Sequence, residues 1–158
     1  MPRTHRLTFP LITAALALSL GASAASAESS VGLRGGFSSH PDQILFGAHF
    51  QPPPVAKNLY IVPSGEMGFG DDAFTLSFNG DLEYQFGREG SVRPYAGGGL
   101  SLYYVNVDNG GSDSNLGVSA LGGLLFDREH GWPIFVELKL GLSDEVPDLK
   151  ALVGVMFR

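Results

Sequence analysis

Hydrophobic and polar residues alternate along most of this chain, and the alternation is most regular between Phe74 and Phe86. One row is apolar or small and consists of Phe74, Leu76, Phe78, Gly80, Leu82, Tyr84 and Phe86; the other is polar and consists of Thr75, Ser77, Asn79, Asp81, Glu83 and Gln85. A period of two predicts a β-strand, because successive side chains of a strand point to opposite faces. The segment is about twice as long as the usual strand of ~5–6 residues and exceeds the ~9–11 residues with which a tilted strand crosses a bilayer. We therefore predict a membrane-spanning strand.

The same period recurs elsewhere and predicts eight strands, separated by turn signals rich in Gly, Pro, Asn and Asp. We expect these strands at residues 31–38, 43–51, 58–69, 73–86, 92–106, 115–127, 132–143 and 148–158. An even number of antiparallel strands joined by short loops can close into a barrel, which leaves no unpaired edge in lipid. The prediction is an all-β fold, an eight-stranded antiparallel up-and-down transmembrane β-barrel. Pro63 lacks the N–H that a strand ladder needs, so we expect a bulge or a shortened strand there.

Alternation alone does not say which row faces the interior, and an apolar interior would make a soluble, lipocalin-like periplasmic carrier of an apolar ligand. Four observations favour apolar rows that face lipid. The polar rows are rich in Gly and Ser, which suits a narrow packed lumen, and eight strands leave an interior just wide enough for side chains. Aromatic residues gather near the strand ends, as in the girdles of membrane barrels. Charged residues make up only 16% of the chain, against ~25% in a typical soluble domain.

Charged side chains on the polar rows predict a plugged lumen. Buried charges persist only when they are paired, because an unpaired one costs several kcal/mol. We predict an ion-pair network in the lumen that consists of Arg34, Glu66, Asp81, Glu83, Arg93, Glu137 and Lys139. His49 lies on the same rows, and a lone histidine among Glu and Arg is expected to be a hydrogen-bonding member of such a network.

The N-terminus has the features of a secretory signal peptide. Arg3 and Arg6 precede a short apolar run, residues 11–20, and Ala25-Ser26-Ala27 offers small residues at a cleavage site. We predict a cleaved signal peptide at residues 1–27 and a barrel domain at residues 28–158. The chain has no cysteine, so no disulfide is possible. After cleavage the chain would contain 8 Lys+Arg and 16 Asp+Glu, and this negative net charge argues against nucleic acid as a partner.

Several segments resemble a known family. Residues 93–99 (RPYAGGG), followed by Tyr103-Tyr104, resemble a strand of the small bacterial outer-membrane β-barrel proteins, the OmpA/OmpX/OmpW-like and opacity-type group. Residues 136–139 and 149–157 resemble its last hairpin. The resemblance implies a location in the outer membrane of a Gram-negative-type bacterium, contact with outer-membrane lipid and lipopolysaccharide, and insertion by the barrel assembly machinery. It also implies that Phe157 is the assembly signal, although the family usually ends on an aromatic residue and this chain ends on Arg158.

The family topology places both termini in the periplasm, so alternate loops face outward. These outer loops carry no Lys or Arg, and their acidic residues are Asp42, Asp71, Asp72, Asp108, Asp113, Asp144 and Glu145. Such carboxylates could bind the divalent cations that bridge lipopolysaccharide phosphates. The same residues are explained by turn formation and loop solvation, and we favour that interpretation.

Catalysis is a weaker hypothesis. Ser38, Ser39, His40 and Asp42 supply the residue types of a hydrolase, but Pro41 makes this segment typical of a tight turn. The His-x-Ser-Asn signature of the outer-membrane lipid A deacylases is absent, and the histidines show no metal-ligand spacing. We expect no catalytic, metal or cofactor site, and a structural or surface-interaction role. The soluble carrier and a lipid-modifying barrel enzyme remain the alternatives.

Overall fold

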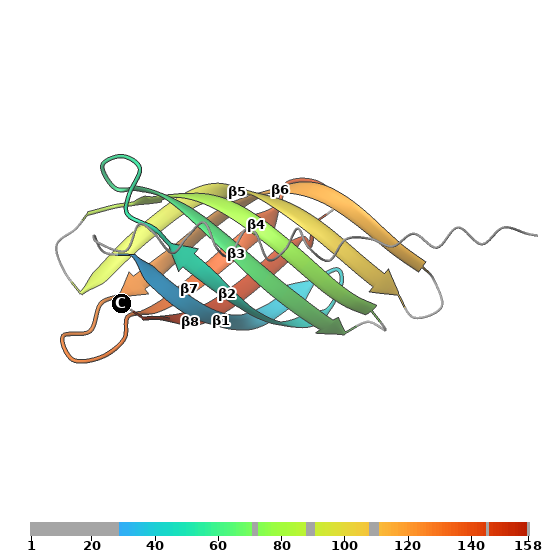
Figure 1. Cartoon of the computed structure of the whole chain (residues 1–158), viewed down its shortest axis with the longest axis horizontal. Helices are drawn as coiled ribbons and strands as arrows, with labels where there is room; N and C mark the ends of the chain where they lie inside the picture. Colours follow the sequence, from blue (N-terminus) through green and yellow to red (C-terminus); the bar gives the residue numbers. More distant parts are fainter. Residues whose placement is uncertain (1–28, 71–72, 88–90, 108–110, 145, 158) are drawn as a thin grey trace, which may run out of the picture.

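The chain folds into a closed barrel of eight antiparallel strands in sequence order (Figure 1). The computed structural model describes residues 29–70, 73–87, 91–107, 111–144 and 146–157, so the predicted signal peptide lies outside the described residues. The strands are β1 (Ser30–Ser39), β2 (Gln43–Gln51), β3 (Leu59–Gly70), β4 (Ala73–Gln85), β5 (Val92–Val107), β6 (Gly111–Phe126), β7 (Ile134–Gly141) and β8 (Leu149–Phe157). The predicted all-β, eight-stranded up-and-down barrel is confirmed. In the described part of the chain, no helix is long and apolar enough to cross a membrane.

Pairing between the first and the last strand closes the barrel. β1 and β8 run antiparallel, with an unbroken register from Val31 opposite Phe157 to Ser39 opposite Leu149. Closure removes the two strand edges that an open sheet would leave unpaired. We call the end where β1 begins and β8 finishes the terminal end, and the opposite end the far end; the mark for the C-terminus lies at the terminal end in Figure 1.

Two sequence expectations about the strands are wrong, and β7 is two residues shorter at each end than the expected 132–143. The register between β3 and β4 continues through Pro63, which lies opposite Gly80, so β3 has no bulge there. The proline is tolerated because the pairing of β3 with β2 ends at Ser64, which leaves Pro63 paired on one side only. The second error concerns β6, which was expected to begin at residue 115 and begins at Gly111. Its polar first residues pair with β5 and lengthen this hairpin beyond its neighbours (Figure 1).

The two faces of the barrel wall differ in polarity as predicted. The large apolar side chains that stand exposed on the outside include Leu33, Phe46, Phe78, Leu100, Leu102, Val118, Leu138 and Val153. Aromatic pairs mark both rims: Trp132 packs on Phe157 at the terminal end, with ring centroids 4.7 Å apart, and Phe69 packs on Phe74 at the far end, with centroids 5.3 Å apart. An outward apolar belt between two aromatic girdles is the surface of a membrane barrel.

Side chains fill the barrel interior from end to end. An apolar cluster in the terminal half consists of Tyr95, Leu121, Leu125, Phe135 and Met156. At the far end Val146, in the connection after β7, packs against Gly117 and Gly141, and a Cβ atom at either glycine would collide with its side chain. Between these apolar parts lies a layer of buried polar and charged residues, which forms the candidate site.

Candidate functional site: a charged network inside the barrel

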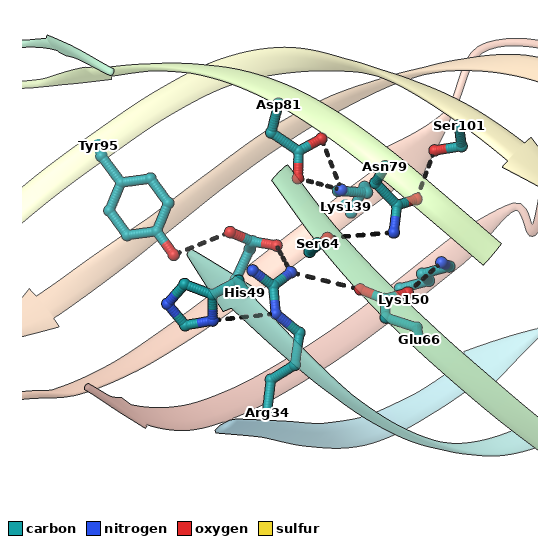
Figure 2. A network of polar contacts seen from close by, with 11 residues as sticks. Arg34, His49, Ser64, Glu66, Asn79, Asp81, Tyr95, Ser101, Lys139 and Lys150 are labelled. Carbon is teal, nitrogen blue, oxygen red and sulfur yellow. Dashed lines mark hydrogen bonds and ion pairs between the residues drawn. The ribbon is translucent and has the colours of Figure 1, made fainter. Parts of the chain in front are cut away.

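Arg34 is the centre of a network of polar contacts in the lumen (Figure 2). It extends from β1, and its Nη1 lies 3.3 Å from Oε1 of Glu66 and 3.6 Å from Oε1 of Glu137. Its Nε donates a hydrogen bond of 3.4 Å to Nδ1 of His49. The guanidinium also lies over the ring of Phe135, 5.7 Å from its centroid, a favourable cation–π arrangement. One cation thus joins side chains from three other strands, β2, β3 and β7.

Two lysines complete the ion pairs. Lys150 donates a hydrogen bond of 2.6 Å from Nζ to Oε2 of Glu66, and its ammonium lies 4.9 Å from the ring centroid of Tyr103. Lys139 donates to both carboxylate oxygens of Asp81, at 2.8 and 2.7 Å. These side chains are at most 2% exposed, so water hardly screens the pairs. Charge-assisted hydrogen bonds of this kind are about twice as strong as neutral ones.

Neutral side chains satisfy further polar atoms of the layer. Tyr95 donates a hydrogen bond of 3.0 Å from its hydroxyl to Oε2 of Glu137. Asn79 donates through Nδ2 to Oγ of Ser64 at 3.2 Å and accepts at Oδ1 from Oγ of Ser101 at 2.6 Å. Tyr95 thus adds β5 to the strands joined around Arg34, and Ser64, Asn79 and Ser101 link β3, β4 and β5 in a separate set (Figure 2).

Inward-facing glycines make room for this layer. A Cβ atom at Gly32 would collide with the ring of His49, and one at Gly99 would collide with the carboxylate of Asp81. Larger residues at these positions would have to displace a member of the network. The Gly-rich polar rows of the sequence thus correspond to a lumen that side chains fill almost completely.

Six of the seven predicted network residues are buried in this layer: Arg34, Glu66, Asp81, Glu83, Glu137 and Lys139. The seventh, Arg93, is the second residue of β5 and lies at the terminal rim. Its Nη2 pairs with Oδ2 of Asp127 at 2.6 Å, and its Nη1 donates to Oε1 of Gln85 at 3.3 Å. Arg93 thus shares the row of the network but ion-pairs separately from it, because its depth in the barrel differs.

Lys150 belongs to the network and was absent from the predicted set. The sequence places it on the inward row of β8 with Leu152, Gly154 and Met156. This position in the alternation is the feature of the sequence that could have identified Lys150 as a lumen residue. A lysine in an inward row of a narrow barrel needs a counter-charge. The structure supplies one in Glu66, which accepts from both Lys150 and Arg34.

Two of the residues considered for catalysis, Ser38 and His40, have different partners in the described structure. Ser38 is buried, and its hydroxyl donates to the carbonyl of Pro41 at 2.9 Å. His40 pairs through Nδ1 with Oδ2 of Asp148 at 3.3 Å, and both side chains are exposed. Of the acidic outer-loop residues, Asp71, Asp72, Asp108 and Glu145 lie outside the described residues.

Comparison with known proteins places the fold. No protein-family model matches the chain, and no curated protein sequence matches it. The N-terminal β-barrel domain of Pseudomonas aeruginosa OprF matches with a TM-score of 0.66 and 18% identity, over 82% of this chain and 95% of that one. Neisserial surface protein A (NspA) matches with a TM-score of 0.59 and 16% identity, over 81% and 92%.

A third solved structure is the outer membrane enzyme PagL, with a TM-score of 0.51 and 14% identity, over 82% of this chain and 99% of that one. The chain therefore has the fold of the small eight-stranded outer-membrane barrels, as its sequence resemblance predicted. Identities this low concern the fold alone, and at least one protein with this fold is an enzyme. The role of the chain has to be argued from its own residues.

Proposed function

We propose that this protein is a non-enzymatic barrel of the outer membrane of a Gram-negative-type bacterium, with a sealed lumen and a structural or surface-interaction role. The observation that carries the proposal is the reversal of polarity across the wall. Apolar side chains such as Leu100 and Leu138, each 57% exposed, stand outside, while Glu66, Asp81 and Lys139 are at most 2% exposed inside. Such a wall is stable where the surroundings are hydrocarbon.

The soluble-carrier alternative needs the opposite arrangement. A carrier of an apolar ligand requires an apolar cavity of several hundred Å³. Inside this barrel the cavity bordered by Arg34, Glu83 and Glu137 measures about 20 Å³ and is flanked by charges. That cavity has neither the volume nor the apolar lining that such a ligand needs.

The enzyme alternative rests on the His40–Asp148 pair and on the similarity to PagL. A nucleophilic mechanism also needs a hydroxyl within reach of the imidazole. The buried Ser38 hydroxyl is occupied by the Pro41 carbonyl. The segment is therefore better explained as a structural turn at the rim of the barrel than as a catalytic site.

A surface-interaction role is supported by the long hairpin at the far end. β6 pairs with β5 along its whole length but with β7 only from Ser119 onward. Val118 already turns to the connection after β7, donating from its N–H to Oγ of Ser143 at 3.2 Å and accepting from the N–H of Leu142 at 2.9 Å. The residues of β6 before Gly117 make no pairs with β7 and lie beyond the part of β6 that the connection after β7 covers. We infer that this hairpin projects from the outer surface, where it meets lipopolysaccharide or a partner.

Envelope fractionation tests the proposal. We expect the protein in the outer-membrane fraction, detergent-dependent in solution, and with a gel mobility that changes on heating because the barrel unfolds. Recovery as a soluble periplasmic protein would contradict the membrane assignment. Hydrolysis of lipid A or phospholipid by the purified protein, lost on His40→Ala, would contradict the non-enzymatic one.

A further inference from the structure

The apolar outer face of the barrel wall is hollowed where the last strands meet the first. A groove of about 720 Å³ crosses the outside of β6, β7, β8 and β1, which are neighbours in the closed sheet. The pairing of these strands shows how the groove is built, because its lining follows rows of residues that lie opposite one another.

The floor of the groove is main chain. Gly36 lies opposite Leu152, Leu152 opposite Glu137, and Glu137 opposite Gly123, so the four residues form one row across the sheet. The side chains of Leu152 and Glu137 are buried in the lumen, and the two glycines have none. This row therefore presents only its backbone to the outside.

Outward-facing apolar side chains form the two walls. Branched side chains such as Val136 line the side nearer the terminal end, and the other side is the row in which Phe37, Ala151, Leu138 and Gly122 lie opposite one another. Ala151 and Gly122 are small and leave this row open at two of its four positions. At Gly122 the space is free, because a Cβ atom there would meet only the carbonyl oxygen of Tyr95, at 3.7 Å.

The dimensions of the groove select its occupant. Its two walls are two residues apart along each strand, about 6.6 Å, and four neighbouring strands span about 14 Å. An α-helix with its side chains is about 10–12 Å wide, so neither a helix nor the wall of a second barrel fits between the rows. A single linear acyl chain does fit. An apolar lining offers water no hydrogen-bond partners, so water does not fill the space.

The groove is also inclined to the barrel axis. Phe37 lies near the far end of β1, whereas Leu124, at the other end of the groove, lies near the terminal end of β6. A chain that enters at the far end thus extends toward the middle of the wall. The described residues of the far rim include no Lys or Arg to bind phosphate, so the groove recognises the chain and not a headgroup.

We propose that this groove binds one acyl chain of lipopolysaccharide and holds it as a resident lipid. The choice of lipid rests on the proposed function, which places the far end at the outer surface, where lipopolysaccharide supplies the acyl chains. General contact with lipid would involve the whole apolar belt equally. Here one chain occupies a defined site over the main chain of Glu137 and Leu152.

Filling the groove with a side chain tests the site. The purified protein, folded in detergent, is incubated with purified lipid A and analysed by native mass spectrometry. We expect one lipid A per monomer. Gly122→Leu places a side chain in the groove and should weaken this binding by roughly tenfold, since the loss of contact with two methylene groups has an effect of that size.

Gly80→Leu is the matched control. Gly80 is an exposed outward residue of β4, outside the groove, and a Cβ atom there would meet nothing within 4 Å. This variant should bind lipid A like the unchanged protein, and Ala151→Phe should repeat the effect of Gly122→Leu from a second strand. Each variant is first checked for heat-modifiable gel mobility, so that only folded barrels are compared. Equal binding by folded Gly122→Leu or folded Ala151→Phe and by the control would overturn the proposal.

Photocrosslinking tests the same site without any substitution. Lipid A with a photoreactive group at the end of an acyl chain should label mainly β6 and β7, and labelling spread evenly over the eight strands would refute a defined site. Preferential retention of phosphatidylethanolamine from an equal mixture with lipid A, or a dimer that Gly122→Leu dissociates, would also overturn the proposal. A folded outer-membrane barrel that retains no lipid A would contradict this site alone, whereas recovery as a soluble periplasmic protein would contradict the proposed function.

Discussion

At the scale of single residues, the pair of Lys139 and Asp81 should contribute strongly to stability. Both side chains are fully buried, and two hydrogen bonds of 2.8 and 2.7 Å join them. Asp81→Asn would leave the ammonium in the lumen without its counter-charge, and breaking a buried pair in this way costs about 3–5 kcal/mol. We expect the free energy of unfolding, measured by urea titration of the protein folded in lipid, to fall by that amount.

Two further variants show whether the unpaired charge is the cause. Asp148→Asn removes the partner of an exposed pair with His40, and its effect should stay below ~1 kcal/mol. Replacing Asp81 and Lys139 together by leucine removes both charges and should cost less than Asp81→Asn alone. A double variant that is less stable than the single one would argue against this account.

The alternation of side chains predicted which residues face the lumen, but it did not predict their depth. Arg93 and Lys150 both point inward, but the depth of each decides whether it reaches the network. Arg93 shares the inward row yet pairs at the rim with Asp127, whereas Lys150, on the inward row of β8, reaches Glu66 in the network. Partners from strands distant in sequence depend on the stagger of all the strands between them, and period-two alternation carries no information about that stagger. The side of the wall to which a side chain points depends on its own strand alone, whereas its partner across the lumen depends on the arrangement of all the strands.

At the scale of elements, the last strand should control assembly. Phe157 lies opposite Val31 in the β1–β8 pairing and packs on Trp132, so it fixes the closing strand at the terminal rim. Deletion of residues 157–158 removes this anchor and shortens the pairing that closes the barrel. We expect the truncated protein to fail to insert and to be degraded in the periplasm, as judged by fractionation and immunoblotting.

Deletion of Arg158 alone is the matched control for that experiment. Arg158 lies outside the described residues, and its loss leaves Phe157 and the whole β1–β8 register intact. We expect nearly normal amounts of heat-modifiable barrel. Normal assembly after loss of both residues would contradict the role of Phe157 as the assembly signal.

The outward-facing rows of the strands should not tolerate charged side chains. Leu100 in β5 and Leu138 in β7 are each 57% exposed on the barrel wall, where we expect acyl chains to surround them. An arginine near the bilayer midplane of a barrel costs roughly 2–4 kcal/mol, and the cost falls toward the interfaces. Leu100→Arg and Leu138→Arg should therefore lower the folded yield in lipid vesicles. Ser91→Arg, at an exposed position just before β5, should fold normally.

Equal yields for all three arginine variants would mean that these leucines do not face hydrocarbon. In that event the assignment of the apolar belt to the membrane would fail. Vesicles with longer acyl chains supply a second comparison, because a thicker hydrocarbon layer should increase the penalty at both leucine positions and leave Ser91→Arg unchanged.

The sequence predicted the strands well where alternation was uninterrupted and less well where the composition was typical of loops. β2 begins and ends at the predicted residues, whereas β6 begins four residues earlier than expected. Its first residues, from Gly111 to Ser114, are small or polar, as in turns. They form a strand because β5 provides an extended partner opposite each of them. Pro63 is the converse case, in which an expected interruption disappears because one neighbouring strand has ended.

At the scale of the whole molecule, a small barrel can be stable in hydrocarbon and still contain charges, because its apolar face and its polar residues are buried in two separate places. The outer, apolar face of the wall is covered by the bilayer, and closure of the barrel satisfies the backbone groups of the strands. The lumen is a second, polar interior, in which Glu66 of β3 binds Arg34 of β1 and Lys150 of β8, two strands with which β3 makes no backbone pairs. The inward glycines are the residues that make both possible, since they narrow the lumen until side chains fill it.

The filled lumen leads to the last prediction, that the monomer conducts no steady porin-scale current. Ions passing from the terminal end would meet Met156 and Phe135 before the Arg34 network, and at the far end Val146 packs between inward glycines. Opening a path would require breaking several buried ion pairs at once, each at a cost of several kcal/mol. In planar bilayers we expect a closed baseline under conditions in which a 16-stranded porin conducts steadily.

The most informative variant is Arg34→Ala, which removes the cation shared by Glu66 and Glu137 and should increase the frequency of brief openings without creating a permanent pore. Large, stable channels from the unchanged monomer would show that the network does not seal the barrel.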